Sequence, residues 1–263
     1  MTLLEQLVSR AGGPALGTWI KLPGVESCEM VAAAGFDFVV IDMEHAPIGI
    51  ESAHRLVMVF SLAGVLPLVR LPEMNKAIIK RLLDAGAGGV LAPHVEEPAT
   101  VGDGLSFSLY PPQGVRGFAT TTRAGRWGGR GRGEHIRDSN AGIVFIPQLE
   151  SERALAQAAE IAAVPGLGTV FIGQADLSVA MGLAETDDRV AALVTEAVRI
   201  FRSRDIIVGT AARDSADAAA QAKQGFDFLV VGNDAGLLAS SARKLVQDTR
   251  SQVRAGAAER GRS

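Results

Sequence analysis

The chain has 263 residues and a formal net charge of −3, with 48% hydrophobic and 21% charged residues. This length is typical of one eight-stranded α/β barrel, and so large an apolar fraction excludes a disordered chain. Because the charges nearly balance, no global electrostatic force favours nucleic acid or an anionic membrane as partner, and we expect neither.

The single cysteine, Cys28, cannot form an internal disulfide or a cysteine metal site, so we expect a reducing, cytoplasmic location. Residues 1–14 include Glu5 and have no long apolar core, unlike a secretory signal. The longest apolar runs, such as residues 38–41 and 65–69, are far shorter than the roughly 20 residues that a membrane helix needs. We therefore expect no membrane span.

Short apolar runs alternate with longer amphipathic segments, which is typical of β-α units around a parallel sheet. Eight runs are predicted to be strands: residues 16–20, 38–42, 66–70, 89–93, 143–148, 169–173, 206–210 and 228–232. Six segments are predicted to be helices: residues 25–34, 50–63, 76–85, 152–163, 189–202 and 216–224. The predicted fold class is α/β, a single (β/α)8 TIM barrel in residues 1–254 that includes a C-terminal helix. Residues 255–263 are predicted to be a flexible tail.

Residues 94–142, between the fourth and fifth strands, are rich in Gly and Arg and far exceed the about 2–6 residues usual for such a loop. A solvated loop is the default interpretation; a lid over an anionic substrate, a subunit contact and a nucleic-acid site are the alternatives. Only residues 110–117 look like an ordered turn, which we expect to bring Arg116 to the rim of the barrel.

Polar side chains follow the C-terminal ends of four predicted strands. They are Asp42, Glu44, His45, Arg70, Gln148, Glu150, Asp176 and Ser178. Because active sites of α/β barrels lie at these strand ends, we expect the polar side chains to share one rim.

Glu150 and Asp176 offer two carboxylates from neighbouring strands. Such a pair suits a hard divalent cation, Mg²⁺ or Mn²⁺, that keeps waters and takes substrate oxygens. The alternative is structural: Asp176 caps the helix after the sixth strand, and Glu150 opens the helix after the fifth.

His45 lies three residues after Asp42, and a strand-end histidine can exchange protons near neutral pH if a carboxylate orients it. Asp42 or Glu44 could orient the ring; the alternative is a surface loop histidine. The remaining histidines, His54, His94 and His135, are predicted to be structural or solvent-facing.

Arg70 ends an apolar run, and a guanidinium there can hold a carboxylate or a developing enolate oxygen. The alternative is a structural ion pair with a rim carboxylate. An imine-forming aldolase would need a lysine at a strand end, and Lys21 alone lies near one. A metal-dependent reaction is therefore favoured over imine chemistry.

Taken together, six motifs resemble the HpcH/HpaI aldolase family, the class II pyruvate aldolases of the phosphoenolpyruvate/pyruvate barrel superfamily, from about residue 17 to residue 238. They are Asp42-Met-Glu-His45-Ala-Pro, Val69-Arg70, Leu83-Asp84-Ala-Gly86, Tyr110-Pro-Pro-Gln-Gly-Val-Arg-Gly117, Pro147-Gln-Leu-Glu150 and Gly173-Gln-Ala-Asp-Leu-Ser178. The combination of these motifs is specific to the family.

The resemblance implies a metal site and a pyruvate site. Glu150 and Asp176 would hold Mg²⁺, Mn²⁺ or Co²⁺. The carboxylate and keto groups of pyruvate would contact Gln148 and the backbone near Gly173, Ala175 and Asp176. The aldehyde half would depend on Trp19, Phe118, Phe171, Ala212 and the long loop.

The resemblance also assigns catalytic roles. Arg70 would steady the enolate, and His45 would move the proton of the aldol hydroxyl, directly or through a water. Asp84 would raise the basicity of His45, and Asp42 belongs to the same catalytic set. Asp84 precedes the fourth strand, at the opposite end of its own barrel, so a neighbouring subunit could supply it.

Family members are similar in being hexamers that exchange a C-terminal helix, for which residues 235–254 are the candidate. Many relatives have proline at the position of Gln174, and residues 123–137 differ from the better known members. Loops at this rim tend to choose the aldehyde, so these departures bear on the substrate.

The predicted function is a class II aldehyde-lyase: reversible, metal-dependent cleavage of 4-hydroxy-2-oxo acids to pyruvate, or a close 2-oxo acid, and an aldehyde. One alternative keeps the site and changes the reaction to oxaloacetate decarboxylation or another enolate-forming lyase or synthase step. A second alternative is a non-catalytic barrel that binds a small acid.

Overall fold

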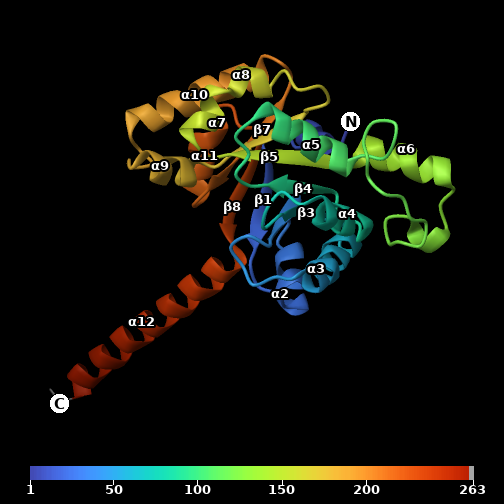
Figure 1. Ribbon diagram of the computed structural model, residues 1–263. Coiled ribbons are helices and arrows are strands. Elements are labelled where there is room, and N and C mark those ends of the chain that lie inside the picture. The colour runs from blue at the N-terminus through green and yellow to red at the C-terminus, as the bar shows by residue number, and fades with distance from the viewer. Residues whose placement is uncertain (261–263) are drawn as a thin grey trace.

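The computed structural model describes residues 1–260, and side chains up to residue 254. Its centre is a closed barrel of eight parallel strands (Figure 1). The strands are β1 (Ala15–Ile20), β2 (Phe38–Asp42), β3 (Leu66–Arg70), β4 (Gly89–Ala92), β5 (Val144–Leu149), β6 (Thr169–Ile172), β7 (Ile207–Ala212) and β8 (Phe228–Asn233). Each strand pairs with the next, and β1 pairs with β8, so the predicted TIM barrel is confirmed.

Helices connect and follow the strands, most of them around the barrel (Figure 1). They are α1 (Leu3–Arg10), α2 (Val25–Ala32), α3 (Ile50–Leu62), α4 (Lys76–Asp84), α5 (Pro98–Ser108), α6 (Arg132–Gly142), α7 (Glu152–Ala156), α8 (Ala158–Ile161), α9 (Gln174–Met181), α10 (Asp188–Arg202), α11 (Ser215–Lys223) and α12 (Asp234–Arg260). The helix predicted over residues 152–163 is two short helices, because the backbone leaves the helical region at Gln157 (φ −97°, ψ 16°).

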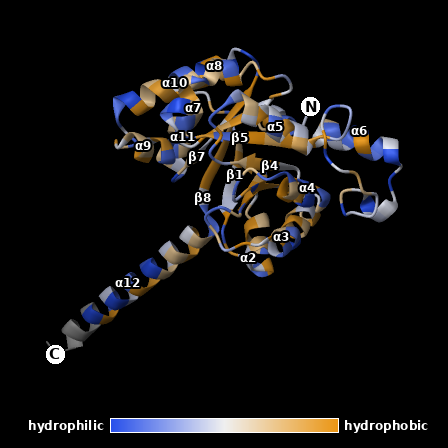
Figure 2. Cartoon of the chain, viewed as in Figure 1, coloured by the Kyte–Doolittle hydropathy of each residue, from blue (hydrophilic) through white to orange (hydrophobic). Residues whose placement is uncertain are grey.

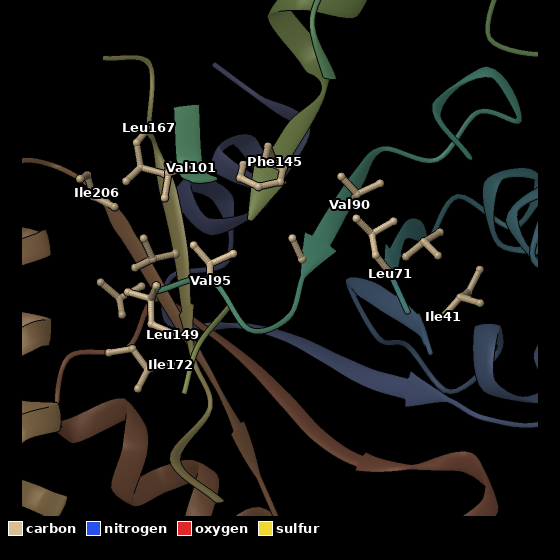
Figure 3. Packing of buried hydrophobic residues seen from close by; sticks show 14 of the residues in the cluster. Ile41, Leu71, Val90, Val95, Val101, Phe145, Leu149, Leu167, Ile172 and Ile206 are labelled. Atoms are coloured by element: carbon tan, nitrogen blue, oxygen red, sulfur yellow. The ribbon is translucent and has the colours of Figure 1, made fainter. Parts of the chain in front are cut away.

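The apolar side chains form two layers, one inside the barrel and one between the strands and the helices. Along β2, Phe38 and Val40 face the interior, whereas Val39 and Ile41 face the helices. Figure 3 shows part of the outer layer, and Figure 2 shows how apolar the strands are. Burial on both faces explains why the strands are continuous apolar runs. Glycine at position 209 leaves room for the ring of Phe228, which a Cβ would approach to 2.1 Å.

The predicted loop at residues 94–142 is wrong in part, because it contains α5 and α6. The glycines of α5 indicated a loop, but a Cβ at Gly104 would lie 2.0 Å from the ring of Phe145 in β5. Glycine here allows α5 to pack closely on the sheet. Residues 109–131 connect the two helices beside the barrel (Figure 1).

The last helix, α12, projects away from the barrel (Figure 1) and packs on β1 and β8 near its start. It continues to Arg260, so part of the predicted tail is helical, and residues 261–263 lie outside the described residues. Its exposed apolar side chains are Leu237, Leu238, Leu245, Val246 and Val253. In residues 1–260, no helix combines the length and the apolar character needed to cross a membrane.

Candidate active site

Asp42 and Arg70 are cross-strand neighbours at the ends of β2 and β3. Arg70 donates from Nε to Oδ1 of Asp42 at 3.0 Å and from Nη2 to Oδ2 at 2.7 Å. The Nζ of Lys21 lies 3.0 Å from Oδ2. Burial raises the pKa of Asp42, but the hydrogen bonds and positive charges around it outweigh burial and lower this pKa to about 2.

Arg70 contacts two further side chains besides Asp42. Its guanidinium lies 4.1 Å from the ring centroid of Trp19, and its Nη1 lies 3.0 Å from Oε2 of Glu44. Trp19 in turn packs edge-on against Phe171, with ring centroids 5.9 Å apart. Arg70 therefore forms the ion pair with a rim carboxylate, Asp42, that was its structural alternative. It also keeps a positive charge at the barrel mouth, where Arg70 is 5% exposed.

The ring of His45 lies near Glu44 rather than Asp42. Its Nε2 is 3.8 Å from Oε2 of Glu44, and the side chain is 56% exposed. Asp42 accepts the backbone N–H groups of Glu44 and His45, both at 3.1 Å. Asp42 thus shapes the turn that carries His45, and Glu44 is the carboxylate beside the ring.

His94 also belongs to this rim, which the sequence interpretation missed. Its ring Nε2 lies 3.1 Å from Oε1 of Glu44, and Nδ1 lies 2.7 Å from Oε1 of Glu150. The ring is 73% exposed, as a solvent-facing residue would be. Its position two residues after β4 is the signal that could have placed it in the site.

Glu150 is a buried carboxylate, 6% exposed, at the end of β5. Its Oε1 accepts the backbone N–H of His94 at 2.7 Å, and its Oε2 accepts from the side-chain amide of Gln148. Burial raises the pKa of Glu150, and the charge of Asp176 adds to the rise, while His94 and Gln148 oppose it. Glu150 and Asp176 line the same cavity, so the two carboxylates are neighbours.

The capping part of the structural alternative for this carboxylate pair is wrong, although Asp176 does lie in the first turn of α9. The N-cap of α9 is Gly173, and no side chain caps the helix. The N-cap of α7 is Ser151, whose hydroxyl accepts from the backbone of Ala154. Neither Asp176 nor Glu150 is therefore engaged as a helix cap.

Glycine at position 173 lets Glu150 and Gln148 lie close to the backbone. A Cβ there would lie 3.0 Å from Cβ of Glu150, and 3.3 Å from Nε2 of Gln148. Ala175 and Asp176 are in the first turn of α9, where backbone N–H groups are free to bind an anion. The side chain of Gln174 contacts β7 and α11, because its amide donates to Thr210 at 3.0 Å and to Gln221 at 2.9 Å.

A cavity of about 290 Å³ lies beside the carboxylates and is lined by His94, Ser151, Glu150 and Asp176, among others. Within the described residues, no group of three or more His, Cys, Asp or Glu side chains is placed to hold a metal ion. The candidate ligands here are therefore the two carboxylates of Glu150 and Asp176. Mg²⁺ is commonly held by one or two carboxylates with waters and substrate oxygens. The buried Oε1 of Gln148 has no hydrogen-bond partner. The donor set fits a divalent cation.

Residues 16–257 match the HpcH/HpaI aldolase/citrate lyase family. The chain belongs to this family. It is 32% identical to a 2-dehydro-3,6-dideoxy-6-sulfogluconate aldolase of Pseudomonas putida, over 91% of this chain and 94% of that protein. It is 34% identical to a 4-hydroxy-2-oxo-heptane-1,7-dioate aldolase of Salmonella arizonae, over 90% of each.

A solved HpcH/HpaI aldolase/citrate lyase family protein from Burkholderia cenocepacia has a similar structure. The TM-score is 0.88 at 29% identity, over 95% of this chain and 100% of that one. The similarity in sequence and structure thus extends over nearly the whole barrel.

The family motif around Asp84 lies apart from the rim. Asp84 ends α4 and accepts from Nη2 of the buried Arg116 at 2.6 Å. The expectation that Arg116 reaches the rim is therefore wrong, because the guanidinium lies 4.5 Å from the ring of Tyr110 and pairs with Asp84. The partner of Asp84 in this chain is Arg116 and not His45.

Phe118 is likewise in the connecting segment. Its ring centroid lies 5.5 Å from that of Tyr110 and 5.6 Å from that of His135. Within one chain it belongs to this aromatic cluster, so its expected place in the aldehyde half is wrong for a single chain. His135 is structural, as predicted: it is 1% exposed, and its Nε2 is 3.1 Å from the hydroxyl of Tyr110.

Proposed function

We propose that the protein is a metal-dependent carbon–carbon lyase that cleaves 4-hydroxy-2-oxo acids to pyruvate, or a close 2-oxo acid, and an aldehyde. The observation that carries the proposal is one rim that combines the carboxylates of Glu150 and Asp176 with the cation of Arg70 and the imidazole of His45. Membership of the HpcH/HpaI aldolase/citrate lyase family and the named aldolases among its relatives support it.

Glu150 and Asp176 are the proposed ligands of the cation, which we expect to be Mg²⁺, Mn²⁺ or Co²⁺. When bound, such a cation supplies positive charge that stabilises negative charge developing on the keto oxygen. Gly173 allows Glu150 to lie close to the backbone, because a Cβ here would be 3.0 Å from Cβ of Glu150.

The substrate carboxylate is proposed to bind at the N-terminus of α9. The backbone N–H groups near Ala175 and Asp176 lie in its first turn, where the helix dipole favours an anion. Gln148 borders this side, where its side-chain amide donates to Glu150. Trp19, stacked on Arg70, would border the opposite side.

In the cleavage direction, His45 takes the proton of the 4-hydroxyl group. The C3–C4 bond breaks, the aldehyde leaves, and the bonding electrons form an enolate that Arg70 stabilises through its buried charge. Protonation at C3 then gives the 2-oxo acid. Glu44, whose Oε2 lies 3.8 Å from Nε2 of His45, is the carboxylate beside the ring.

The complete site is proposed to need a second copy of the chain. Asp84 would approach His45 of a neighbouring subunit, since the two do not meet within one chain. The exposed apolar side chains of α12 support an exchange of this helix between subunits of a hexamer.

Pyruvate release from a panel of 4-hydroxy-2-oxo acids, set against CO₂ release from oxaloacetate, tests the reaction type. We expect aldehyde and pyruvate in equal amounts from the hydroxy acids. Borohydride added with pyruvate is expected to leave the chain unmodified, because Lys21 is paired with Asp42. Release of CO₂ from oxaloacetate with no aldol cleavage, or a reduced imine on a lysine, would contradict the proposal.

A further inference from the structure

His94 has a backbone conformation that histidine rarely adopts. Its φ is 55°, in the left-handed region that glycine, and less often asparagine, occupies readily. Strained residues of this kind persist where their surroundings enforce them, and they gather at functional sites.

Both the backbone and the ring of His94 converge on one oxygen. The backbone N–H donates to Oε1 of Glu150 at 2.7 Å, and Nδ1 lies 2.7 Å from the same atom. The other ring nitrogen, Nε2, lies 3.1 Å from Oε1 of Glu44. His94 thus connects the carboxylate after β5 with the carboxylate after β2.

The three side chains in these contacts differ in solvent exposure. Glu150 is 6% exposed and the side chain of Glu44 is 9% exposed, whereas the ring of His94 is 73% exposed. Because so exposed a ring gains little from apolar burial, packing does not explain why the strained conformation is kept. The polar contacts with the two carboxylates remain as the reason.

We propose that His94 is a positioning residue that orients Glu150 for the divalent cation, an inference that rests on the function proposed above. Glu150 is held on both oxygens, Oε1 by His94 and Oε2 by Gln148. Groups that hydrogen-bond to a metal ligand usually set its orientation.

Binding of Mn²⁺ to the full-length protein, followed by titration calorimetry without substrate, tests this role. His94→Gly keeps the backbone N–H, relieves the strain and removes the ring. We expect the Kd for Mn²⁺ to rise about 10- to 100-fold, with no fall in melting temperature. His94→Asn tolerates the left-handed backbone and has a donor near the position of Nδ1, so we expect it to recover part of the affinity.

Asp205→Gly is the matched control, because Asp205 has the same left-handed backbone (φ 57°) in the turn before β7, at the opposite end of the barrel. We expect it to leave Mn²⁺ binding unchanged. If Mn²⁺ binds to His94→Gly within about twofold of the wild-type Kd while Glu150→Gln abolishes binding, the positioning role is wrong and the proposed function stands. If Glu150→Gln binds Mn²⁺ with the wild-type Kd, both the proposed metal site and the role of His94 are wrong.

Discussion

Arg70 and Asp42 form a two-point ion pair at the ends of β3 and β2, with contacts of 3.0 and 2.7 Å and with Asp42 fully buried. Their strand register places them opposite each other. The pair fixes the guanidinium against Trp19, so the positive charge proposed to stabilise the enolate is in place before substrate binds.

Asp42→Asn is expected to destabilise the protein, because Lys21 would lose its partner and Arg70 would lose its two-point contact, with Glu44 as its remaining carboxylate. Breaking a buried pair in this way costs about 3–5 kcal/mol, which corresponds to a melting temperature lower by about 6–20 °C in a chain of this size. Thermal denaturation measures the change. Glu196→Gln, which breaks an exposed pair with Arg199, is the control and should change the melting temperature little. Equal effects of the two substitutions would contradict the structural role of Asp42.

Gly173→Ala is expected to impair metal binding more than stability. Its Cβ would press on the Cβ of Glu150 at 3.0 Å and displace the carboxylate. The Kd for Mn²⁺ should rise about 10-fold or more. Gly102→Ala, in α5, meets nothing within 4 Å and should stabilise the protein by about 0.5–1 kcal/mol without changing Mn²⁺ binding. Wild-type affinity in Gly173→Ala would show that this space is not part of the site.

The fold should lose stability on acidification through His135. Burial lowers the pKa of His135, and the charges of Arg116 and Arg130 lower it further, so the folded protein binds the proton less readily than the unfolded chain. The stabilising contribution is therefore present above a pH of about 6.5 and is lost as the pH falls through the lower folded pKa.

Urea denaturation between about pH 7 and pH 5 measures this effect. The free energy of unfolding should fall more steeply in the wild type than in His135→Gln, which keeps a polar group near Tyr110 but does not titrate. Parallel pH dependences in the two proteins would rule out His135 as the cause.

The barrel was predictable from the sequence because its strands are buried on both faces, so each one is a largely apolar run, and β2 and β3 end in the polar residues Asp42 and Arg70. The helix α5 was not predicted from the sequence, because its glycines are typical of loops. Their use in close packing against Phe145 becomes visible only when α5 and β5 lie together.

The site was predictable in part for the same reason. Strand ends predicted Glu150, Asp176 and Arg70 as site residues, but the residues at the N-caps of α9 and α7, Gly173 and Ser151, depend on where the helices begin. His94 was missed because its chemistry arises from a left-handed backbone and from carboxylates far away in the sequence.

The central claim is that Glu150 and Asp176 hold a cation needed for carbon–carbon bond cleavage. Pyruvate release from a 4-hydroxy-2-oxo acid, measured after EDTA treatment and again after Mn²⁺ is restored, tests it most directly. We expect EDTA to abolish release, Mn²⁺ to restore it in the wild type, and turnover to stay at least about 100-fold lower in Glu150→Gln and Asp176→Asn. Undiminished release in EDTA, or full recovery in either variant, would contradict the claim.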